Sequence, residues 1–261
     1  MPLATTIDEV IARLEGILAE CDSRRSGAGY FAALYHKVTC RVRDGIAAHE
    51  FEDGARMEQL DVTFANRYIA AWDAWRAGGQ PTASWKTAFE STRRRRVLVL
   101  QHLLLGMNAH INLDLGIATV AIAQGGDLAA AHRDFNEINT ILAALTYEVV
   151  NDLNRVSPLL SLLGFHATNY NAVLMQFALS NARDGAWCFA EELYTKQGDA
   201  ATACIAARDV SINLLAQGLT HAKGLMRITL GLIWLFEWHN PRKIIGVMRG
   251  YRKKFLKMGT T

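Results

Sequence analysis

His110 and Asp114 are the two residues of this chain whose types and spacing best fit chemistry. They lie four positions apart in a long apolar stretch, so a helix would place both side chains on one face. A histidine that is oriented by a carboxylate can transfer protons near neutral pH. The pair therefore predicts an acid–base site in which His110 is the general acid or base and Asp114 orients it.

The stretch that carries this pair, Val97 to Gly126, is apolar apart from a few polar residues, and Asp114 is its only formally charged side chain. A helix that is apolar on every side belongs in the middle of a bundle. An unpaired polar group there costs on the order of 1–3 kcal/mol. The polar residues must therefore have partners, either in a structural network or in a ligand. Those nearest the pair are Gln101, His102, Asn108 and Asn112.

The two faces of this central helix are predicted to meet different neighbours. Gln101, Asn108 and Asn112 fall on the face opposite His110. Gly106 lies one turn before His110, where the missing side chain lets a partner helix or a ligand approach closely.

A second carboxylate, Asp61, lies in a helix predicted from Asp53 to about Ala77. It shares a face with Phe64 and Tyr68, so it points toward the core. Desolvating a carboxylate alone costs several kcal/mol, so Asp61 needs a partner. Two explanations remain open: a buried salt bridge or helix-end hydrogen bond, and a site carboxylate that converges with the His110 pair.

The fold class follows from composition and periodicity. The chain has 261 residues, of which 51% are hydrophobic, with four prolines and apolar residues recurring at three and four positions. This pattern predicts an all-α, single-domain bundle of about eight helices around a buried central helix. Residues 1–223 are expected to form the bundle. Residues 224–261 are expected to add an apolar helix and a basic amphipathic helix packed on it.

The C-terminal segment differs in character from the bundle. Gly224 to Trp238 is nearly all apolar, but it is short for a membrane span and is interrupted by Arg227. Residues 241–257 read as a basic amphipathic helix, which can lie on an anionic membrane surface or dock on the bundle. Both alternatives remain open.

A further basic segment, Arg93 to Arg96, directly precedes the central helix. It is typical of a solvated turn whose side-chain stems cover apolar surface, and the alternative is contact with a phosphate or an acidic partner.

Composition excludes several classes of function. A net charge of +3 is too small to indicate a nucleic-acid partner. The four cysteines lack metal-type or redox-type spacing, and no secretory signal opens the chain, so the expected location is the cytoplasm, with peripheral membrane contact as the alternative. The sequence has no phosphate-binding glycine loop, nucleophile elbow, zinc-protease motif or paired-aspartate motif, and no nucleotide or flavin signature.

A divalent metal such as zinc or iron is a second interpretation of the central pair. Two ligands cannot hold such an ion, so further ligands would have to come from other helices. The candidates are Asp61, His102, Asp134 and His166.

Four segments resemble an uncharacterised all-helical family, a domain of unknown function, over about Tyr30 to Leu215. The segments are LDVTFANRY (60–68), the Pro81 to Trp85 spacing, LQHLLLGMNAHINLDL (100–115) and ARDGAW (182–187). The most specific part is the pattern G-x-N-A-H-x-x-x-D at 106–114. The residues that fall on the family pattern are Asp61, Tyr68, Gln101, Asn108, His110, Asp114, Arg183 and Trp187; His102 departs from it. The resemblance implies no established activity.

Two functions remain as hypotheses. The first is an enzyme of hydrolase, lyase or cyclase type, in specialised metabolism, that acts on a small apolar molecule. His110, Asp114 and Asp61 would be its catalytic residues. The substrate-binding residues would be Gln101, Asn108, Tyr68, Arg183 and Trp187, of which the last two are one turn apart, as for a guanidinium over an indole. The second is a non-catalytic ligand-binding or membrane-surface protein whose polar cluster is structural.

Overall fold

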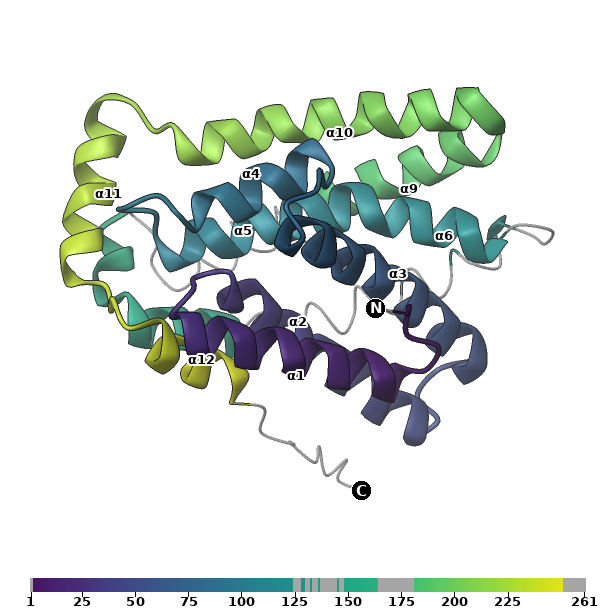
Figure 1. The fold of residues 1–261 in the computed structure, drawn as a ribbon, viewed down its shortest axis with the longest axis horizontal. Helices are drawn as coiled ribbons and strands as arrows, with labels where there is room; N and C mark the ends of the chain where they lie inside the picture. Colours follow the sequence, from purple (N-terminus) through teal and green to yellow (C-terminus); the bar gives the residue numbers. More distant parts are fainter. Residues whose placement is uncertain are drawn as a thin grey trace, which may run out of the picture.

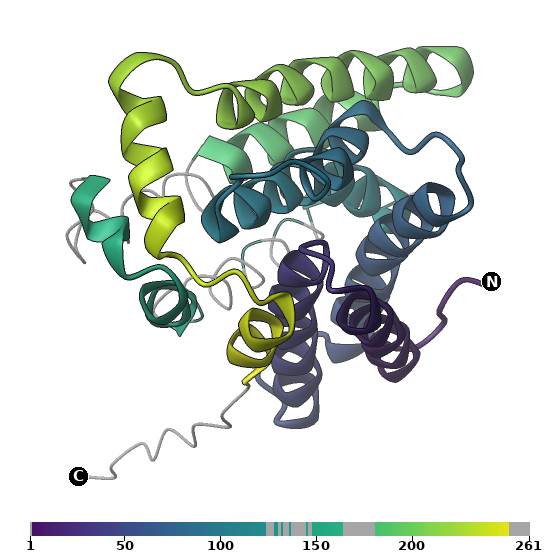
Figure 2. The ribbon, with the colours of Figure 1, turned by 60° about the vertical axis from the view of Figure 1, so that its left-hand side comes forward.

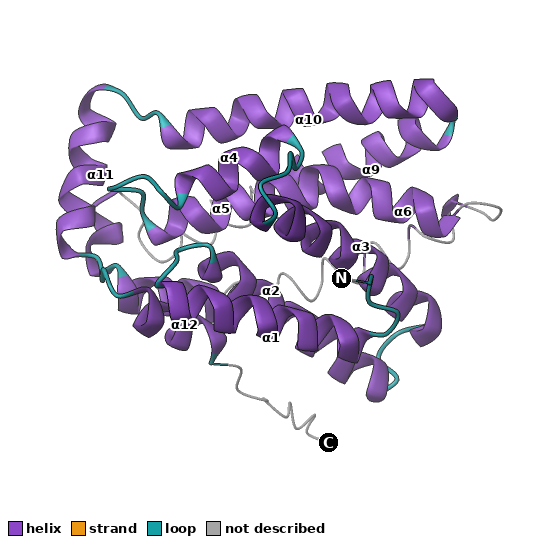
Figure 3. Cartoon of the chain, in the orientation of Figure 1, coloured by secondary structure: helices purple, strands orange, loops and turns teal. Residues whose placement is uncertain are grey.

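The computed structural model shows a chain folded into packed helices (Figure 1). It describes residues 2–123, 128–129, 132, 136, 145, 148–163 and 181–250. These residues contain no strand, so the all-α prediction is confirmed (Figure 3). The predicted count of about eight helices is too low, because the described residues contain ten α-helices. One reason is that a π-helical turn divides the predicted central helix in two.

The helices have the following bounds. The first six are α1 (Ile7–Arg24), α2 (Gly29–Ala47), α3 (Gly54–Arg76), α4 (Ala83–Ser91), α5 (Val99–Ala109) and α6 (Gly116–Ala123). The others are α9 (Asn181–Tyr194), α10 (Gly198–Thr220), α11 (Gly224–Phe236) and α12 (Pro241–Arg249). Two further turns are the π-helical η1 (His110–Leu115) and the 3₁₀-helical η2 (Pro158–Leu163).

The first and third helices begin at residues whose side chains cap them. The Thr6 hydroxyl accepts a hydrogen bond from the backbone N–H of Glu9 at 3.2 Å. The Asp53 carboxylate accepts one from the N–H of Arg56 at 2.9 Å. Such caps satisfy backbone donors that have no partner inside the helix.

The cap of α4 comes from a distant part of the chain. The carboxylate of Asp209, on α10, accepts hydrogen bonds from the backbone N–H of Ala83 and of Ser84 at 2.5 and 3.0 Å. It also accepts one from the Ser84 hydroxyl at 2.6 Å. A carboxylate is favourable at a helix N-terminus because the helix dipole is positive there. These bonds fix α4 against α10.

Helices α5, η1 and α6 form one continuous apolar element in the interior, as predicted for a buried central helix. By length and composition, Val99–Ala123 is the one described helix that could cross a membrane, and 94% of its most apolar window is buried. At Gly106 a Cβ would overlap the ring of Phe31. The missing side chain therefore admits the partner helix α2.

The helices lie in two groups with α3 between them (Figure 1). Helices α4, α5, α6, α9 and α10 pack on one another along one side, and α1, α2 and α12 pack together on the other. Figure 2 shows α12 beside α2 and shows α11 standing at one end of the molecule. Helix α11 packs against η2.

The basic helix α12 turns its apolar side toward the bundle. Ile244, Ile245 and Met248 are buried. Arg242 donates a hydrogen bond to the backbone carbonyl of Asp22 at 2.9 Å, and Arg249 pairs with a glutamate of α1 at 3.0 Å. The apolar face of residues 241–249 is therefore covered by protein. Residues 251–257 lie outside the described part of the chain.

Candidate functional site

Asp114 lies at the centre of the candidate site, and its side chain is only 1% exposed. One oxygen, Oδ1, accepts a hydrogen bond from Arg67 Nε at 3.2 Å. The other, Oδ2, accepts one from Trp85 Nε1 at 2.8 Å and faces His110 Nδ1 at 3.3 Å. Three elements, α3, α4 and η1, thus converge on one carboxylate. The positive charge of Arg67 balances it.

The π-helical turn η1 contains both members of the predicted pair. All six of its residues, His110 to Leu115, are buried. π-turns inside α-helices are rare and occur frequently at functional sites. The predicted pairing of His110 with Asp114 is present in the structure despite this change of helical period.

His110 is enclosed by aromatic rings. Its imidazole stacks on Phe64, with ring centroids 3.6 Å apart and planes inclined by 5°, and the Tyr35 ring is 4.4 Å away. Burial lowers the pKa of His110, and the hydrogen bond to Asp114 only partly opposes this. The ring is therefore neutral at pH 7. We assign its proton to Nδ1, which faces Asp114, so that Nε2 carries the free lone pair.

Four buried polar atoms, on His110, on two of its aromatic neighbours and on Asp61, have no hydrogen-bond partner. They are His110 Nε2, Tyr35 Oη, Tyr68 Oη and Asp61 Oδ2. In the part of the chain that the structure describes, only two other buried side-chain atoms share this condition. The Tyr35 and Tyr68 ring centroids lie 5.9 Å apart, and that of Tyr68 lies 6.2 Å from His110. Each unpaired group costs on the order of 1–3 kcal/mol, so their concentration in one place calls for an explanation.

Asp61 lies one turn before Phe64 on α3, and burial raises its pKa to about 7, with a smaller contribution from Glu58. Burial likewise raises the pKa of Tyr35, and the charges of Asp61 and Asp114 raise it further. Both carboxylates therefore act on the same tyrosine. Among the described residues no hydrogen bond or ion pair joins Asp61 to His110, so their predicted direct convergence stays a prediction.

A cavity of about 540 Å³ opens onto Asp114 from the surface. Arg67 and Trp85 line it together with apolar and polar side chains of α3 and of the loop before α4. The Arg67 side chain is 37% exposed and uses Nε for Asp114. Its terminal nitrogens make no other hydrogen bond to the residues described, so they can bind a ligand acceptor.

The Trp85 side chain separates this cavity from the aromatic interior. On its other side a small cavity of about 20 Å³ is lined by Phe31, Tyr68 and Gly106. Such a volume holds about one water molecule. A displacement of the Trp85 indole would join the two spaces.

Two predicted substrate ligands are hydrogen-bonded to the backbone of α10. Gln101 Nε2 donates to the Leu219 carbonyl at 2.6 Å, and its Oε1 accepts from the Leu98 N–H at 2.9 Å. Asn108 Nδ2 donates to the Ile212 carbonyl at 2.9 Å. Both lie on the face opposite His110, and we do not include them in the proposed site.

The other predicted ligands, Arg183 and Trp187, lie on α9. The Trp187 indole donates to Glu191 at 2.8 Å, and its ring lies 4.2 Å from that of His132. The side chain of Arg183 is outside the described residues, so its predicted stacking on Trp187 stays a prediction.

The metal interpretation receives no support from the described residues, which contain no group of three or more metal-ligating His, Cys, Asp or Glu side chains. His102 faces Ser91 Oγ at 3.1 Å, and burial lowers its pKa to about 4. Asp134 and His166 lie outside the described residues.

Sequence reasoning missed four residues that contact or surround the pair: Tyr35, Phe64, Arg67 and Trp85. Phe64 and Arg67 fall within the segment LDVTFANRY, and Trp85 ends the Pro81 to Trp85 spacing. These were the segments that carried the family resemblance, and that was the one signal pointing to them. Tyr35 lies in none of these segments, and we find no signal for it.

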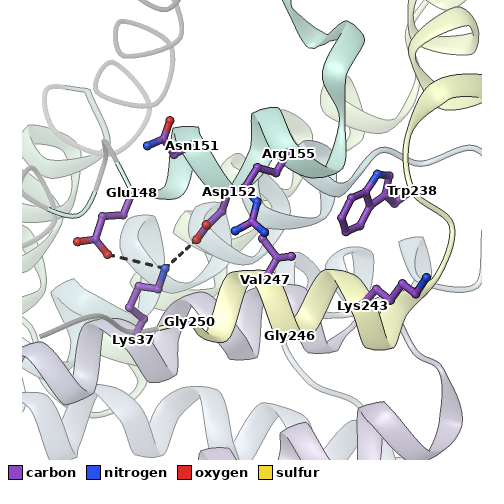
Figure 4. Close-up of a pocket in the computed structure, with 10 residues that line it drawn as sticks. All are labelled: Lys37, Glu148, Asn151, Asp152, Arg155, Trp238, Lys243, Gly246, Val247 and Gly250. Atoms are coloured by element: carbon purple, nitrogen blue, oxygen red, sulfur yellow. Dashed lines mark hydrogen bonds and ion pairs between the residues drawn. The ribbon is translucent and has the colours of Figure 1, made fainter.

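A second buried charge lies at the largest described cavity, of about 740 Å³ (Figure 4). The Lys37 side chain is 2% exposed, and its ammonium lies 2.8 Å from Asp152 and 3.9 Å from Glu148. Figure 4 shows the lysine reaching from α2 toward both carboxylates. Arg155 and Trp238 line this cavity as well.

Comparison with known proteins gives one match. A family model described as "Family of unknown function (DUF5995)" matches residues 7–222. No curated protein and no solved structure matches the chain. The expected resemblance to an uncharacterised domain family is thereby confirmed. The matched region includes every residue of the candidate site, whereas α11 and α12 follow it.

Proposed function

We propose a small-molecule enzyme function for this chain, which belongs to the DUF5995 family of proteins of unknown function. In this proposal neutral His110 transfers a proton through Nε2, and Asp114 orients the ring and stabilises its charged form. A histidine–carboxylate pair in other enzymes acts in this way. The observation that carries the proposal is a neutral, buried imidazole whose Nε2 has no hydrogen-bond partner and whose neighbours Tyr35 and Tyr68 also have unpartnered hydroxyls.

The cavity beside Asp114 indicates the kind of ligand. Its lining is largely apolar, with Ala70, Ala71, Ala74 and Pro81 among the residues, and Arg67 supplies a cation at one end. A ligand with an apolar body and one acceptor group, such as a carbonyl or carboxylate, fits this lining. Guanidinium nitrogens bind such oxygens well.

Access to His110 imposes a requirement on the mechanism. Asp114 and Trp85 line the cavity, and His110 lies behind them. In this proposal the Trp85 indole moves away from Asp114 to admit the reacting atom to the aromatic interior that contains His110. Ligand binding is then expected to change the signal of the Trp85 indole N–H, which Trp85→Phe identifies in an NMR spectrum.

Non-catalytic ligand binding in the same cavity is the second candidate. The observation that favours it is that Asp114 rather than His110 lines the cavity. In that case Arg67 and Asp114 would hold the ligand, and His110 would only position Asp114.

The two candidates are separated by metabolite profiling with purified protein. The wild type is incubated with a small-molecule extract, and consumed compounds are identified by mass spectrometry. An enzyme converts many equivalents of one compound, and His110→Phe and Asp114→Asn abolish the conversion while the exposed control His221→Gln retains it. Stoichiometric retention of a compound without conversion, equal in wild type and His110→Phe, would overturn the enzyme proposal and support binding.

A further inference from the structure

Helix α11 exposes large apolar side chains along most of its length. Leu225 is 79% exposed, Ile228 63%, and Phe236 60%, and Ile233 is the one buried residue of the helix. Met226, Leu232 and Leu235 are exposed as well. Soluble proteins rarely expose several large apolar side chains on one helix, and large exposed apolar patches mark interaction sites.

The surroundings of this helix are cationic. From Val210 to Phe236 the sequence contains no aspartate or glutamate, and it contains Lys223 and Arg227. The guanidinium of Arg96 lies over the Trp234 ring of α11, 5.6 Å from its centroid, so the exposed arginine run Arg93–Arg96 meets α11 at Arg96, while Arg93 stacks on Trp75 of α3.

The combination of apolar and basic groups favours an anionic lipid surface over a second copy of the chain as the partner. A symmetric dimer through α11 would bring the two sets of cations toward each other, and like charges across an interface are costly. An anionic lipid surface instead accepts apolar side chains at the level of its headgroups and pairs with the cations. With 13 residues, α11 is about 20 Å long, which is too short to span a bilayer.

We infer that α11, with the arginine run beside it, docks the protein on anionic membrane surfaces. The sequence pointed to residues 241–257 for such contact, but the apolar side of residues 241–249 is buried against the bundle. The apolar contact is therefore made by α11, which lies parallel to the membrane and inserts Leu225 and Ile228. This surface is independent of the proposed acid–base site.

Vesicle co-sedimentation of the full chain tests the inference. The vesicles are phosphatidylcholine alone, or phosphatidylcholine with phosphatidylserine. The wild type is expected to bind the mixed vesicles, less so at high salt, because screening weakens the cationic contribution. The double variant Leu225→Ser/Ile228→Ser should bind at least about tenfold more weakly, because two large apolar side chains no longer leave water when the protein binds. Arg94→Gln/Arg95→Gln should weaken binding to the mixed vesicles only.

The matched control is Val210→Ser/Leu214→Ser, which removes equally exposed apolar side chains from α10. It should bind as the wild type does. Equal vesicle binding by the α11 variant and the wild type would overturn the inference. So would the absence of vesicle binding together with a dimer, in sedimentation velocity, that the α11 variant abolishes; that result would assign the surface to a second copy.

Discussion

Two buried charges, Lys37 and Asp114, are held in this molecule in different ways. Lys37 faces two carboxylates, at 2.8 and 3.9 Å, so its charge is more than balanced. Asp114 meets one guanidinium and two uncharged nitrogen groups, of Trp85 and His110.

The difference lies in what surrounds each charge. On His110, Tyr35, Tyr68 and Asp61 four buried polar atoms lack a hydrogen-bond partner, whereas the Lys37 ammonium faces two carboxylates (Figure 4). A group that only stabilises a fold is expected to be paired as Lys37 is. Groups kept for function commonly carry a stability cost. The comparison therefore supports a structural role for Lys37 and the proposed functional role for the His110 cluster.

The largest expected loss of stability comes from breaking the ion pair of Lys37. Asp152→Ala removes the closer carboxylate and leaves the ammonium buried, with only Glu148 at 3.9 Å. Breaking a buried pair in this way costs about 3–5 kcal/mol, so the melting temperature should fall by roughly 10 °C. Thermal unfolding followed by circular dichroism measures this.

The matched double variant Lys37→Met/Asp152→Leu removes the whole pair. Replacing a buried pair by apolar side chains is often neutral, so most of the lost stability should return. A double variant as unstable as Asp152→Ala would contradict a purely structural role for Lys37.

Removing the charge of Asp61 should raise stability instead of lowering it, and the size of this gain should depend on pH. Its pKa of about 7 lies above the ordinary 3.8, so the folded chain holds the proton more tightly than the unfolded chain. The contribution of Asp61 to stability is therefore fully present below about pH 4 and is lost as the pH rises to about 7. With about 1.4 kcal/mol for each pKa unit, the ionised carboxylate costs the fold up to about 4 kcal/mol.

Asp61→Asn cannot ionise, so it should melt several degrees above the wild type near pH 8 and close to the wild type near pH 4. Melting curves across this pH range measure the difference. A variant that is less stable than the wild type near pH 8 would show that Asp61 has a stabilising partner. Asp61 would then be a structural group, as Lys37 is.

His110→Phe tests the site directly with a smaller expected change. The new ring can stack on Phe64, and Asp114 keeps Arg67 and Trp85 as partners. We therefore expect a change in stability within about 1 kcal/mol, as for a substitution that conserves core volume. A loss of about 3–5 kcal/mol in chemical denaturation would instead mark His110 as part of a structural network.

The smallest effect is expected at Glu148, the more distant partner of Lys37, which is 26% exposed. Partly exposed ion pairs contribute about 0–1 kcal/mol, so Glu148→Gln should change the unfolding free energy by less than about 1 kcal/mol. A loss as large as that of Asp152→Ala would mean that the ammonium needs both carboxylates.

Local sequence rules predicted the parts of the fold that local physics decides. The helix predicted from Asp53 begins there, the central helix is buried, and His110 meets Asp114 four residues on. The hydrogen bond from Arg67 was not predictable in this way. Arg67 points away from the face of Asp61, and only the packing of α3 shows that its own face meets Asp114.

Gln101 and Asn108 show the same limit of sequence-based prediction, because they were predicted to bind a substrate. A polar residue on a buried helix needs a partner, and the sequence cannot distinguish a ligand from a neighbouring backbone. The partner proved to be the backbone of α10, more than 100 positions away.

The capping of α4 by Asp209 has a consequence for the order of folding. A nine-residue helix is only marginally stable alone in water, and the residues that cap this one are 125 and 126 positions from Asp209. We therefore expect α4 to become ordered late, when α10 docks. Trp85, which fixes Asp114, lies on α4. The cluster of His110 and Asp114 would then be assembled in the last stage of folding, at the rate at which α10 docks.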